Sequence, residues 1–243
     1  MKSLSTIFLD GKFIKIGNKT LEVFTPGIFQ AQGVFETMLA VGQEVFDVAS
    51  HLKRLRGAFK GVRVSKSIIE QVVKLNGFEV SRVRVIAWKE GQHKHVVVMA
   101  LKHVLTNNKE YKVCLIKTSR QAHARFSNIK SLDYKIFADA YQMALSQGFD
   151  EALLINNKGY VFEASRSNVF WFKENRMYTP PLSSGCLNGI MRSKVIKYAR
   201  KFKISFQEKI FSVEELKAAD RVFLTNSLIG IKVLKNSFPF LPR

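Results

Sequence analysis

Lys130 is the residue whose surroundings first suggest chemistry. It lies in "SNIKSLDY", directly before a segment whose apolar residues recur at helical spacing. A lysine at the start of such a helix can point inward, and desolvation together with nearby positive charge then lowers the pKa of the amine and leaves it nucleophilic. A solvated surface lysine is the simpler interpretation, because the chain contains 39 Lys and Arg residues. Lys130 is therefore a candidate for covalent catalysis.

Glu163 is an acid at the end of the strand-like run "YVFE". Burying a carboxylate among such apolar neighbours costs free energy unless a cation lies beside it. An ordinary acid at a strand end would simply be solvated. If a pyridoxal ring lay against this strand, however, the carboxylate could keep the ring nitrogen protonated, and a protonated ring is the electron sink on which that cofactor's chemistry relies.

Three further segments could bind an anion. In "CLNGIMRSKV", Gly189 precedes an expected helix start, where backbone N–H groups without helical partners can bind phosphate. The segment "FLTNS" is a strand followed by a polar turn that could supply N–H and hydroxyl groups. Arg54 in "HLKRL" could be a third ligand, although a single arginine on a helix is usually solvated. Each signal is weak by itself.

Other catalytic patterns are weaker in this sequence. His93 and His95 have the spacing of two metal ligands on a strand, but no carboxylate or cysteine follows closely, so no metal site is predicted. Cys186 has no obvious histidine partner in the sequence and is interpreted as a small buried residue. The sequence contains no GxxxxGK[ST] phosphate-binding motif.

The formal net charge of +20 attracts anions, among them phosphorylated cofactors, carboxylates and nucleic acid. The cations are spread along the whole chain and no RNA-binding motif is visible, so nucleic acid is not expected as the main partner. Two cysteines favour a reducing cytoplasm. The N-terminal "MKSLSTIFLDGKF" lacks the apolar run of a signal peptide, and no apolar run approaches the length of a membrane span. We expect a cytoplasmic protein without membrane segments.

The elements that must position these residues begin with two predicted hairpins, in "STIFLDGKFIKI" and "GVFETMLAVGQEVFDV". Ser50 is the expected N-cap of a helix through "HLKRLRGAFKG", and a second helix is expected from Ser67 to Leu75. The segments "SRVRVIAW" and "KHVVVMAL" are predicted strands joined by a turn. Residues 1–105 are therefore expected to form a smaller N-terminal α/β domain.

The polar stretch "VLTNNKE" is predicted to be a linker, and residues 106–243 are expected to form a larger C-terminal domain that carries Lys130. Two helices are predicted in this domain, with three short apolar strands in "EALLIN", "YVFEAS" and "NVFWF". The apolar helical stripes are Tyr134, Phe137, Tyr141 and Leu145, and Met191, Val195, Tyr198 and Phe202. Strands and helices mix without strict alternation, which favours an α+β fold.

Taken in order, six segments of this chain resemble the fold-type IV pyridoxal-phosphate enzymes. That family includes branched-chain aminotransferases, D-amino-acid aminotransferases and aminodeoxychorismate lyases. The segments are "GVFETML", "HLKRL", "IKSLDY", "GFDEALLINNKGYVFEASRSNVFWF", "TPPLSSGCLNGIMR" and "VFLTNSLIG". The resemblance covers almost the whole chain. It implies a two-domain α+β fold with mixed sheets and flanking helices, and pyridoxal 5′-phosphate as the cofactor.

The resemblance also implies a role for each matching residue. Lys130 corresponds to the Schiff-base lysine, which moves a proton between the substrate Cα and the cofactor C4′. Glu163 corresponds to the acid that pairs with the pyridine nitrogen. Leu187 would lie against the ring as an apolar wall, and Tyr134 would approach the phenolic oxygen of the cofactor.

The same resemblance implies a phosphate site. Its residues would be Arg54, Gly189, Ile190, Met191, Asn226 and Ser227. Many family members have threonine where this chain has Met191, so one hydroxyl contact to the phosphate would be missing here. A hydrogen bond to a charged group contributes roughly 1.5–3 kcal/mol, and the remaining ligands could still retain the phosphate.

Two reactions remain open, because both begin when Lys130 takes the α-proton. An aminodeoxychorismate lyase eliminates pyruvate from 4-amino-4-deoxychorismate and leaves 4-aminobenzoate, a folate precursor, whereas an aminotransferase moves the amino group onto the cofactor. "GVFETML" is most like the lyase group, in which Thr37 would face the pocket as part of the catalytic site. D-amino-acid aminotransferases trap the substrate carboxylate with an arginine and a histidine, but the corresponding "WKEGQHKHV" contains no arginine. We expect a lyase, with a branched-chain or D-amino-acid aminotransferase as the alternative.

The resemblance further implies a homodimer, with the active site between the two domains, and an amino-acid-like substrate that carries a carboxylate. A hypothesis of another class is a pseudo-enzyme of this fold that binds RNA or another polyanion. Its support is the net charge of +20, and against it stands the joint presence of Lys130, Glu163 and Arg54.

Overall fold

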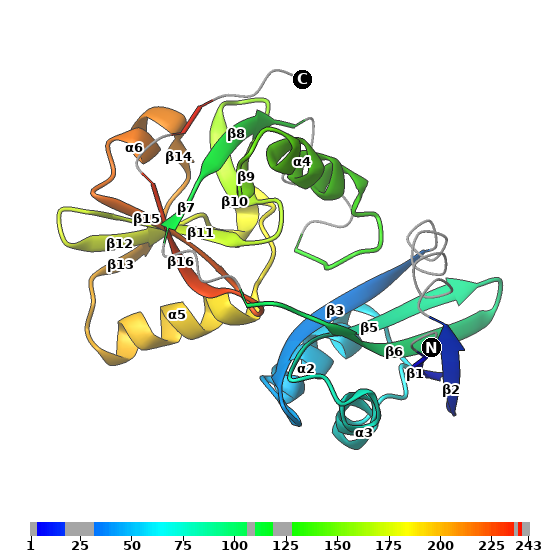
Figure 1. The fold of residues 1–243 in the computed structure, drawn as a ribbon. Coiled ribbons are helices and arrows are strands. Elements are labelled where there is room, and N and C mark those ends of the chain that lie inside the picture. The colour runs from blue at the N-terminus through cyan, green and yellow to red at the C-terminus, as the bar shows by residue number, and fades with distance from the viewer. Residues whose placement is uncertain (1–3, 18–31, 106–109, 119–127, 236–237, 240–243) are drawn as a thin grey trace. The chain divides into compact units, whose positions relative to one another are not determined.

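The computed structural model describes residues 4–17, 32–105, 110–118, 128–235 and 238–239, and the chain forms two compact units (Figure 1). Unit 1 contains Met1–Leu105 and Lys130–Tyr134, and unit 2 contains Thr106–Ile129 and Lys135–Arg243. The expected second domain includes Lys130, whereas the structure packs the Lys130 segment with unit 1. The physical reason is that residues 130–132 hydrogen-bond to a strand of that unit.

Unit 1 is built on a six-stranded antiparallel sheet in the order β2-β1-β6-β5-β3-β4. The strands are β1 (Leu4–Leu9), β2 (Lys12–Gly17), β3 (Gln32–Val41), β4 (Glu44–Val45), β5 (Val80–Glu90) and β6 (His93–Lys102). Both predicted hairpins are confirmed, since β1 pairs with β2 and β3 pairs with β4. The first hairpin turns at Asp10 and Gly11, which both have positive φ.

Two helices pack on this sheet, α2 (Val48–Ala58) on β3 and α3 (Lys66–Asn76) on β1 and β6. The expected N-cap at Ser50 is wrong: Asp47 precedes α2, and the helix begins early enough to bury Val48. The second helix agrees with its prediction more closely. The Ser65 hydroxyl accepts the Ile68 N–H, and α3 ends at Gly77 in the left-handed conformation.

Unit 2 contains two sheets, one of four strands in the order β14-β10-β9-β8 and one of six in the order β13-β12-β11-β15-β16-β7. The strands are β7 (Glu110–Tyr111), β8 (Val113–Lys117), β9 (Glu151–Ile155), β10 (Tyr160–Ala164), β11 (Asn168–Lys173), β12 (Arg176–Thr179), β13 (Phe206–Glu208), β14 (Phe211–Ser212), β15 (Arg221–Asn226) and β16 (Gly230–Leu234). Leu153 and Val161 from the first sheet share one buried core with Trp171 and Leu224 from the second. The two sheets therefore pack against each other.

The helices of unit 2 are α4 (Lys135–Ser146), α5 (Ile190–Lys201) and α6 (Val213–Lys217), with a short 3₁₀ helix η1 (Leu182–Ser184) before α5. The predicted apolar stripes are partly wrong. Leu145, Tyr198 and Phe202 are exposed. Because α5 packs on β15 and β13, its buried face consists of Arg192, Val195, Ile196 and Ala199. The two aromatic residues lie outside this face.

Among the helices of the described segments, the longest have 12 residues. A helix needs about 20 apolar residues to cross a bilayer. None of the helices in the described residues is long and apolar enough to do so.

Candidate active site

The Lys130 segment lies along strand β3 in unit 1. The Phe35 N–H donates to the Lys130 carbonyl and the Leu132 N–H donates to the Gly33 carbonyl, both at 2.9 Å. Gly33 permits this close approach, because a Cβ there would lie 2.4 Å from the Ala87 carbonyl oxygen and 2.6 Å from Leu132 Cδ1. The backbone on either side of Lys130 is therefore fixed by strand hydrogen bonds.

The Lys130 side chain is half-buried and lies against two aromatic rings. Its Nζ is 4.2 Å from the ring centroid of Phe35 and 5.4 Å from that of Tyr134. The two rings meet edge to face, 5.3 Å apart. This amine is thus not a fully solvated surface group, and Tyr134 lies beside it.

Arg84 is a candidate that sequence reasoning missed. It pairs in register with Thr37 across β3 and β5, so both side chains are on one face of the sheet, and its guanidinium carbon is 5.6 Å from the Phe35 ring centroid. Burial, together with the charge of Arg82, lowers the pKa of Arg84 to about 10. The signal was present in "SRVRVIAW", where arginines alternate with apolar residues in a strand. We name Lys130, Phe35, Tyr134, Thr37 and Arg84 the lysine cluster.

Arg54, on α2, is held by an acid on β3. Its Nε donates to Glu36 Oε1 at 2.7 Å and its Nη2 to Oε2 at 2.6 Å, and His51 Nδ1 lies 2.7 Å from the same Oε2. Glu36 is buried. Burial by itself would raise the pKa of Glu36, but hydrogen bonds and charge from Arg54 and His51 lower it below its ordinary value. Arg54 is therefore positioned by a buried ion pair.

In unit 2, Glu163 is a buried carboxylate at the end of β10. Its Oε2 accepts the Leu187 N–H at 3.0 Å, and Asn168 Nδ2 donates to the Leu187 carbonyl at 2.8 Å. Burial, and then the negative charge of Glu163, raises the pKa of the Cys186 thiol to about 11. Cys186 is thus an inert buried thiol, and Glu163 and Leu187 are adjacent.

The start of α5 has the features of an anion site. Gly189 is its N-cap, no side chain caps the helix and no acid lies in its first turn, so the N–H groups of Ile190 and Met191 face away from the helix. A Cβ at Gly189 would lie 2.1 Å from Asn168 Oδ1, so a larger residue here would have to displace the Asn168 side chain.

The turn after β15 contains Asn226 and Ser227. Asn226 Oδ1 accepts the N–H groups of Leu228 at 2.8 Å and Ile229 at 2.9 Å, and its Nδ2 donates to Ser167 Oγ at 2.9 Å. Asn168 links this turn to the start of α5. It pairs with Thr225 of β15, and its side chain donates to the Leu187 carbonyl. The Glu163 cluster, as we name it, consists of Glu163, Leu187, Gly189, Ile190, Met191, Asn226 and Ser227.

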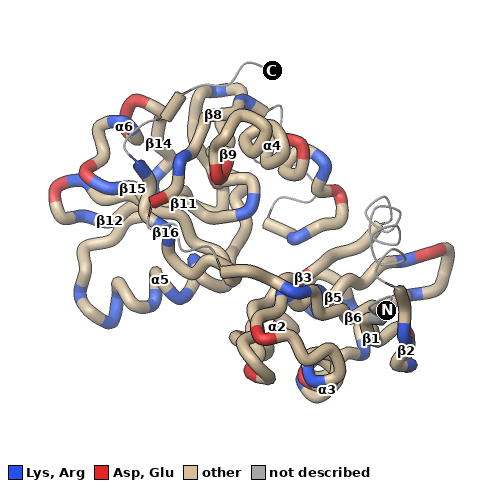
Figure 2. Tube along the Cα trace, viewed as in Figure 1, with Lys and Arg blue, Asp and Glu red and all other residues tan. Residues whose placement is uncertain are grey.

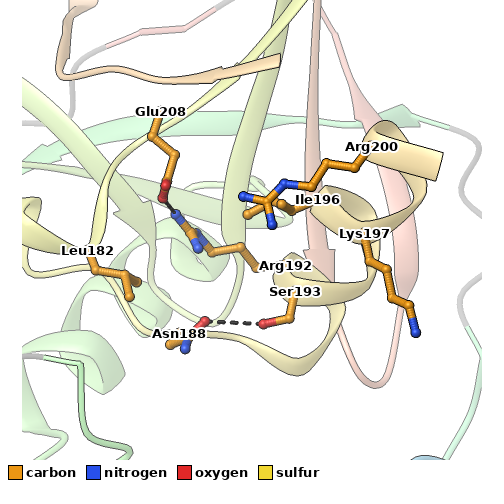
Figure 3. Close-up of a pocket in the computed structure, with 8 residues that line it drawn as sticks. All are labelled: Leu182, Asn188, Arg192, Ser193, Ile196, Lys197, Arg200 and Glu208. Carbon is orange, nitrogen blue, oxygen red and sulfur yellow. Dashed lines mark hydrogen bonds and ion pairs between the residues drawn. The ribbon is translucent and has the colours of Figure 1, made fainter. Parts of the chain in front are cut away.

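A pocket of about 420 Å³ lies beside α5 (Figure 3). Its lining residues are Leu182, Asn188, Arg192, Ser193, Ile196, Lys197, Arg200 and Glu208. It contains none of the predicted site residues. The buried Arg192 donates to the Pro180 carbonyl at 2.9 Å and pairs with Glu208, which anchors the first turn of α5. Figure 2 shows Lys and Arg on both units, several of them along α5.

A family model described as amino-transferase class IV matches residues 33–235. This match covers most of the chain, and the protein therefore belongs to the class IV aminotransferases. The expected two-domain α+β fold of this family and the expectation of a pyridoxal-phosphate-dependent enzyme are both confirmed. Among the described residues, no group of three His, Cys, Asp or Glu side chains could hold a metal ion.

Relatives with two different activities resemble the chain. The aminodeoxychorismate lyase of Bacillus subtilis is 26% identical over 248 residues, which cover 93% of this chain and 84% of the relative. The branched-chain-amino-acid aminotransferase of Pseudomonas aeruginosa is 26% identical over 257 residues, covering 94% and 83%. The crystal structure of a branched-chain aminotransferase from Thermoproteus uzoniensis with norvaline superposes with a TM-score of 0.82 at 26% identity, covering 96% of this chain and 86% of that one.

Proposed function

We propose that this protein is an aminodeoxychorismate lyase, which eliminates pyruvate from 4-amino-4-deoxychorismate and leaves 4-aminobenzoate for folate synthesis. The observation that carries the proposal is the lysine cluster, in which Thr37 and Arg84 lie on the same sheet face as Phe35, whose ring contacts the Lys130 amine. The substrate carries two carboxylates, and a half-buried arginine beside a hydroxyl suits such a ligand. A pocket for a branched aliphatic side chain needs apolar residues instead.

The side chains present fit pyridoxal phosphate. The Glu163 carboxylate is buried, which suits an acid that faces a pyridine nitrogen, and the α5 start presents N–H groups beside Gly189, where a Cβ would displace the Asn168 side chain. When bound, the cofactor supplies a protonated ring that withdraws electrons from the substrate. Glu163 would hold that ring nitrogen and Leu187 would cover the ring face.

The phosphate of the cofactor would be bound by backbone N–H groups and by polar or charged side chains. Ile190 and Met191 would donate backbone N–H groups, and Asn226 and Ser227 would add the turn after β15. Arg54 would supply the cation, oriented by its two hydrogen bonds to Glu36. Met191 has no hydroxyl, so this chain binds the phosphate at that position through the backbone alone.

Lys130 would attach the cofactor through its amine, and the amino group of the substrate would displace it, which frees the amine to act as the base. Its amine takes the proton from the substrate carbon that bears the amino group, and Tyr134 lies close enough to keep the amine in place. Arg84 would bind a substrate carboxylate, and the Thr37 hydroxyl would donate to a substrate oxygen. Loss of the enolpyruvyl group then makes the ring aromatic, and protonation of the released enol gives pyruvate.

An aminotransferase of branched-chain amino acids is the second candidate. It is favoured by the similarity to branched-chain aminotransferases of Pseudomonas aeruginosa and Thermoproteus uzoniensis. The same residues would act in this reaction. Thr37 and Arg84 would then bind the α-carboxylate of the amino acid, which has no second carboxylate. A D-amino-acid aminotransferase is disfavoured by the composition of "WKEGQHKHV".

One pair of assays separates the two reactions. The purified protein with pyridoxal phosphate is supplied either with 4-amino-4-deoxychorismate or with leucine and 2-oxoglutarate, and a parallel reaction contains D-alanine. We expect pyruvate and 4-aminobenzoate in equal amounts from the first mixture. Glutamate formation without any 4-aminobenzoate would make the protein an aminotransferase and would end the lyase proposal.

We also propose that the protein works as a homodimer, because the family that it resembles forms homodimers. Light scattering should then give about twice the chain mass of 27.7 kDa. The competing polyanion-binding hypothesis predicts instead no spectral change on addition of pyridoxal phosphate, and an RNA affinity that falls steeply with salt.

A further inference from the structure

Glu151, at the start of β9, is a fully buried acid outside the proposed catalytic residues. Its side chain is 1% exposed and accepts from three donors. The Ala152 N–H donates to Oε1 at 3.1 Å, the Ser165 hydroxyl donates to the same oxygen, and the Ser167 hydroxyl donates to Oε2 over a longer 3.3 Å. A buried carboxylate is costly, so three donors gathered on this one need a structural or functional reason.

The Oε2 side of this acid leads to the turn after β15. The Ser167 hydroxyl has a single proton, which it donates to Glu151, so its lone pairs face the Asn226 amide that donates to it at 2.9 Å. The same amide nitrogen, Nδ2, also donates to the Arg166 carbonyl at 3.2 Å, so Ser167 Oγ is one of two acceptors that hold this end of the Asn226 amide. The other end, Oδ1, is then left to accept the N–H groups of Leu228 and Ile229.

On the Oε1 side, Ser165 donates to the carboxyl group and belongs to the same strand-to-strand connection as Ser167. Two serines thus bind the same carboxyl group, and Ser167 continues the network to Asn226.

We propose that Glu151 is a positioning residue, which acts through Ser167 and Asn226 to fix the turn that binds the cofactor phosphate. The inference rests on the proposed function, since it assigns the turn after β15 to the phosphate. Glu151 itself touches neither cofactor nor substrate. Its carboxylate takes the Ser167 proton and so leaves the lone pairs of that hydroxyl for the Asn226 amide.

The consequence of Glu151→Gln can be derived from the donors. The Ala152 N–H and the Ser165 hydroxyl both donate to Oε1, so the glutamine carbonyl must take that position and its NH₂ must face Ser167. Ser167 would then accept from the glutamine, and its proton would lose the acceptor that Glu151 provided. A hydroxyl oxygen has two lone pairs, so the Asn226 contact persists only if that proton turns to another acceptor, and we expect the contact to weaken while the volume of the side chain is unchanged.

The test compares the affinities for pyridoxal phosphate and for pyridoxal, which lacks the phosphate. Both dissociation constants are measured by absorbance titration for the wild type, Ser167→Ala, Glu151→Gln and the matched control Ser165→Ala, with thermal melting to check folding. We expect the ratio of the pyridoxal constant to the pyridoxal-phosphate constant to fall about 3- to 10-fold in Ser167→Ala and Glu151→Gln, the equivalent of one lost hydrogen bond. The ratio in Ser165→Ala should equal that of the wild type.

The outcomes separate this inference from the proposed function. A wild type that binds pyridoxal phosphate, with an unchanged ratio in either folded variant of Ser167 or Glu151, overturns the positioning role and leaves the proposed function intact. An equal fall in Ser165→Ala also overturns it, because the effect would then be a general loss of packing around Glu151. A wild type that binds neither ligand rejects the proposed function itself.

Discussion

At the scale of single residues, the proposed chemistry depends on an amine that is held against two rings. The Lys130 Nζ lies within 6 Å of Phe35 and Tyr134, a distance at which the rings hold an ammonium by cation–π attraction. The neighbouring Arg84 adds positive charge on the same sheet face. The lysine cluster therefore combines partial desolvation with a second cation, which both favour a neutral, nucleophilic amine, while the two rings hold the ammonium form in place.

Lys130→Ala should remove covalent attachment of the cofactor and lower turnover by at least about 100-fold, because the variant has no base at this position. The measurement is borohydride reduction followed by mass spectrometry, with circular dichroism to verify the fold. Lys135→Ala is the matched control, since Lys135 is exposed and pairs only with Asp139 in the interactions of the described residues. Label on Lys135, or activity that survives the loss of Lys130, would contradict the assignment.

Arg84→Gln should raise the KM for 4-amino-4-deoxychorismate by roughly 10- to 100-fold with a smaller effect on kcat. A charge-assisted hydrogen bond to a carboxylate is worth about 1.5–3 kcal/mol. Steady-state kinetics provides the test. Arg82→Gln removes a cation from the same face of β5, two residues away, and should change KM less. Equal effects of the two substitutions would indicate a general electrostatic contribution and no specific contact.

At the scale of elements, β3 connects most of unit 1's candidate residues. Phe35 and Thr37 lie on the face of the lysine cluster, Glu36 lies on the opposite face beside Arg54, and Gly33 accepts the Lys130 segment. The alternation of a strand separates these roles onto two faces within five residues. A one-residue shift in the register of β3 would therefore turn Phe35 and Thr37 away from the lysine cluster and Glu36 away from Arg54.

Gly33→Ala should destabilise the fold by about 1–3 kcal/mol, because the new Cβ would overlap the Ala87 carbonyl and the Leu132 side chain. It should also slow cofactor attachment, since Leu132 lies two residues from Lys130. Urea denaturation and the rate of appearance of the cofactor absorbance band measure the two effects. Gly57→Ala is the control: nothing lies within 4 Å of its Cβ, and alanine in α2 should be neutral or stabilising by up to about 1 kcal/mol. Equal stabilities of the two variants would refute the close-approach argument.

At the scale of the whole molecule, two buried acids give stability opposite dependences on pH. Burial raises the pKa of Glu151 above its ordinary value, so folding favours its neutral form, and the ionised form that accepts from both serines is present above this raised pKa. The ion pair with Arg54 and His51 outweighs burial and lowers the pKa of Glu36. Glu36 therefore contributes stability above about pH 4.5 that is lost as the pH falls, whereas the contribution of Glu151 is present below about pH 4.5 and is lost as the pH rises.

The difference in unfolding free energy between the wild type and Glu151→Gln should therefore fall as the pH rises from about 4.5 toward the raised pKa of Glu151. Urea titrations between about pH 4.5 and pH 8 measure it. Glu44→Gln, at an exposed position, is the control and should show no such trend. A difference that grows with pH would show that folding favours the ionised form of Glu151.

The sequence by itself determined the hairpins of unit 1, the helix expected from Ser67 to Leu75, which the structure has at Lys66–Asn76, and the order of motifs that marks the family. These features depend on local signals, such as the Asp10-Gly11 turn and the glycine after the helix, which act within a few residues. Lys130, Glu163 and the residues proposed to bind the phosphate were named from motifs alone. The apolar stripe predicted for α5 was wrong: Arg192 is buried and pairs with Glu208, whereas Tyr198 and Phe202 are exposed.

Only the tertiary structure decided the partners of these residues. It joined the Lys130 segment to β3, placed Arg84 beside Phe35, paired Arg54 with Glu36 and linked Glu151 to Asn226 through Ser167. Each of these contacts joins positions far apart in the chain or depends on strand register. The physical reason is that burial and hydrogen-bond direction depend on what packs across the sheet, which no local pattern of residues encodes.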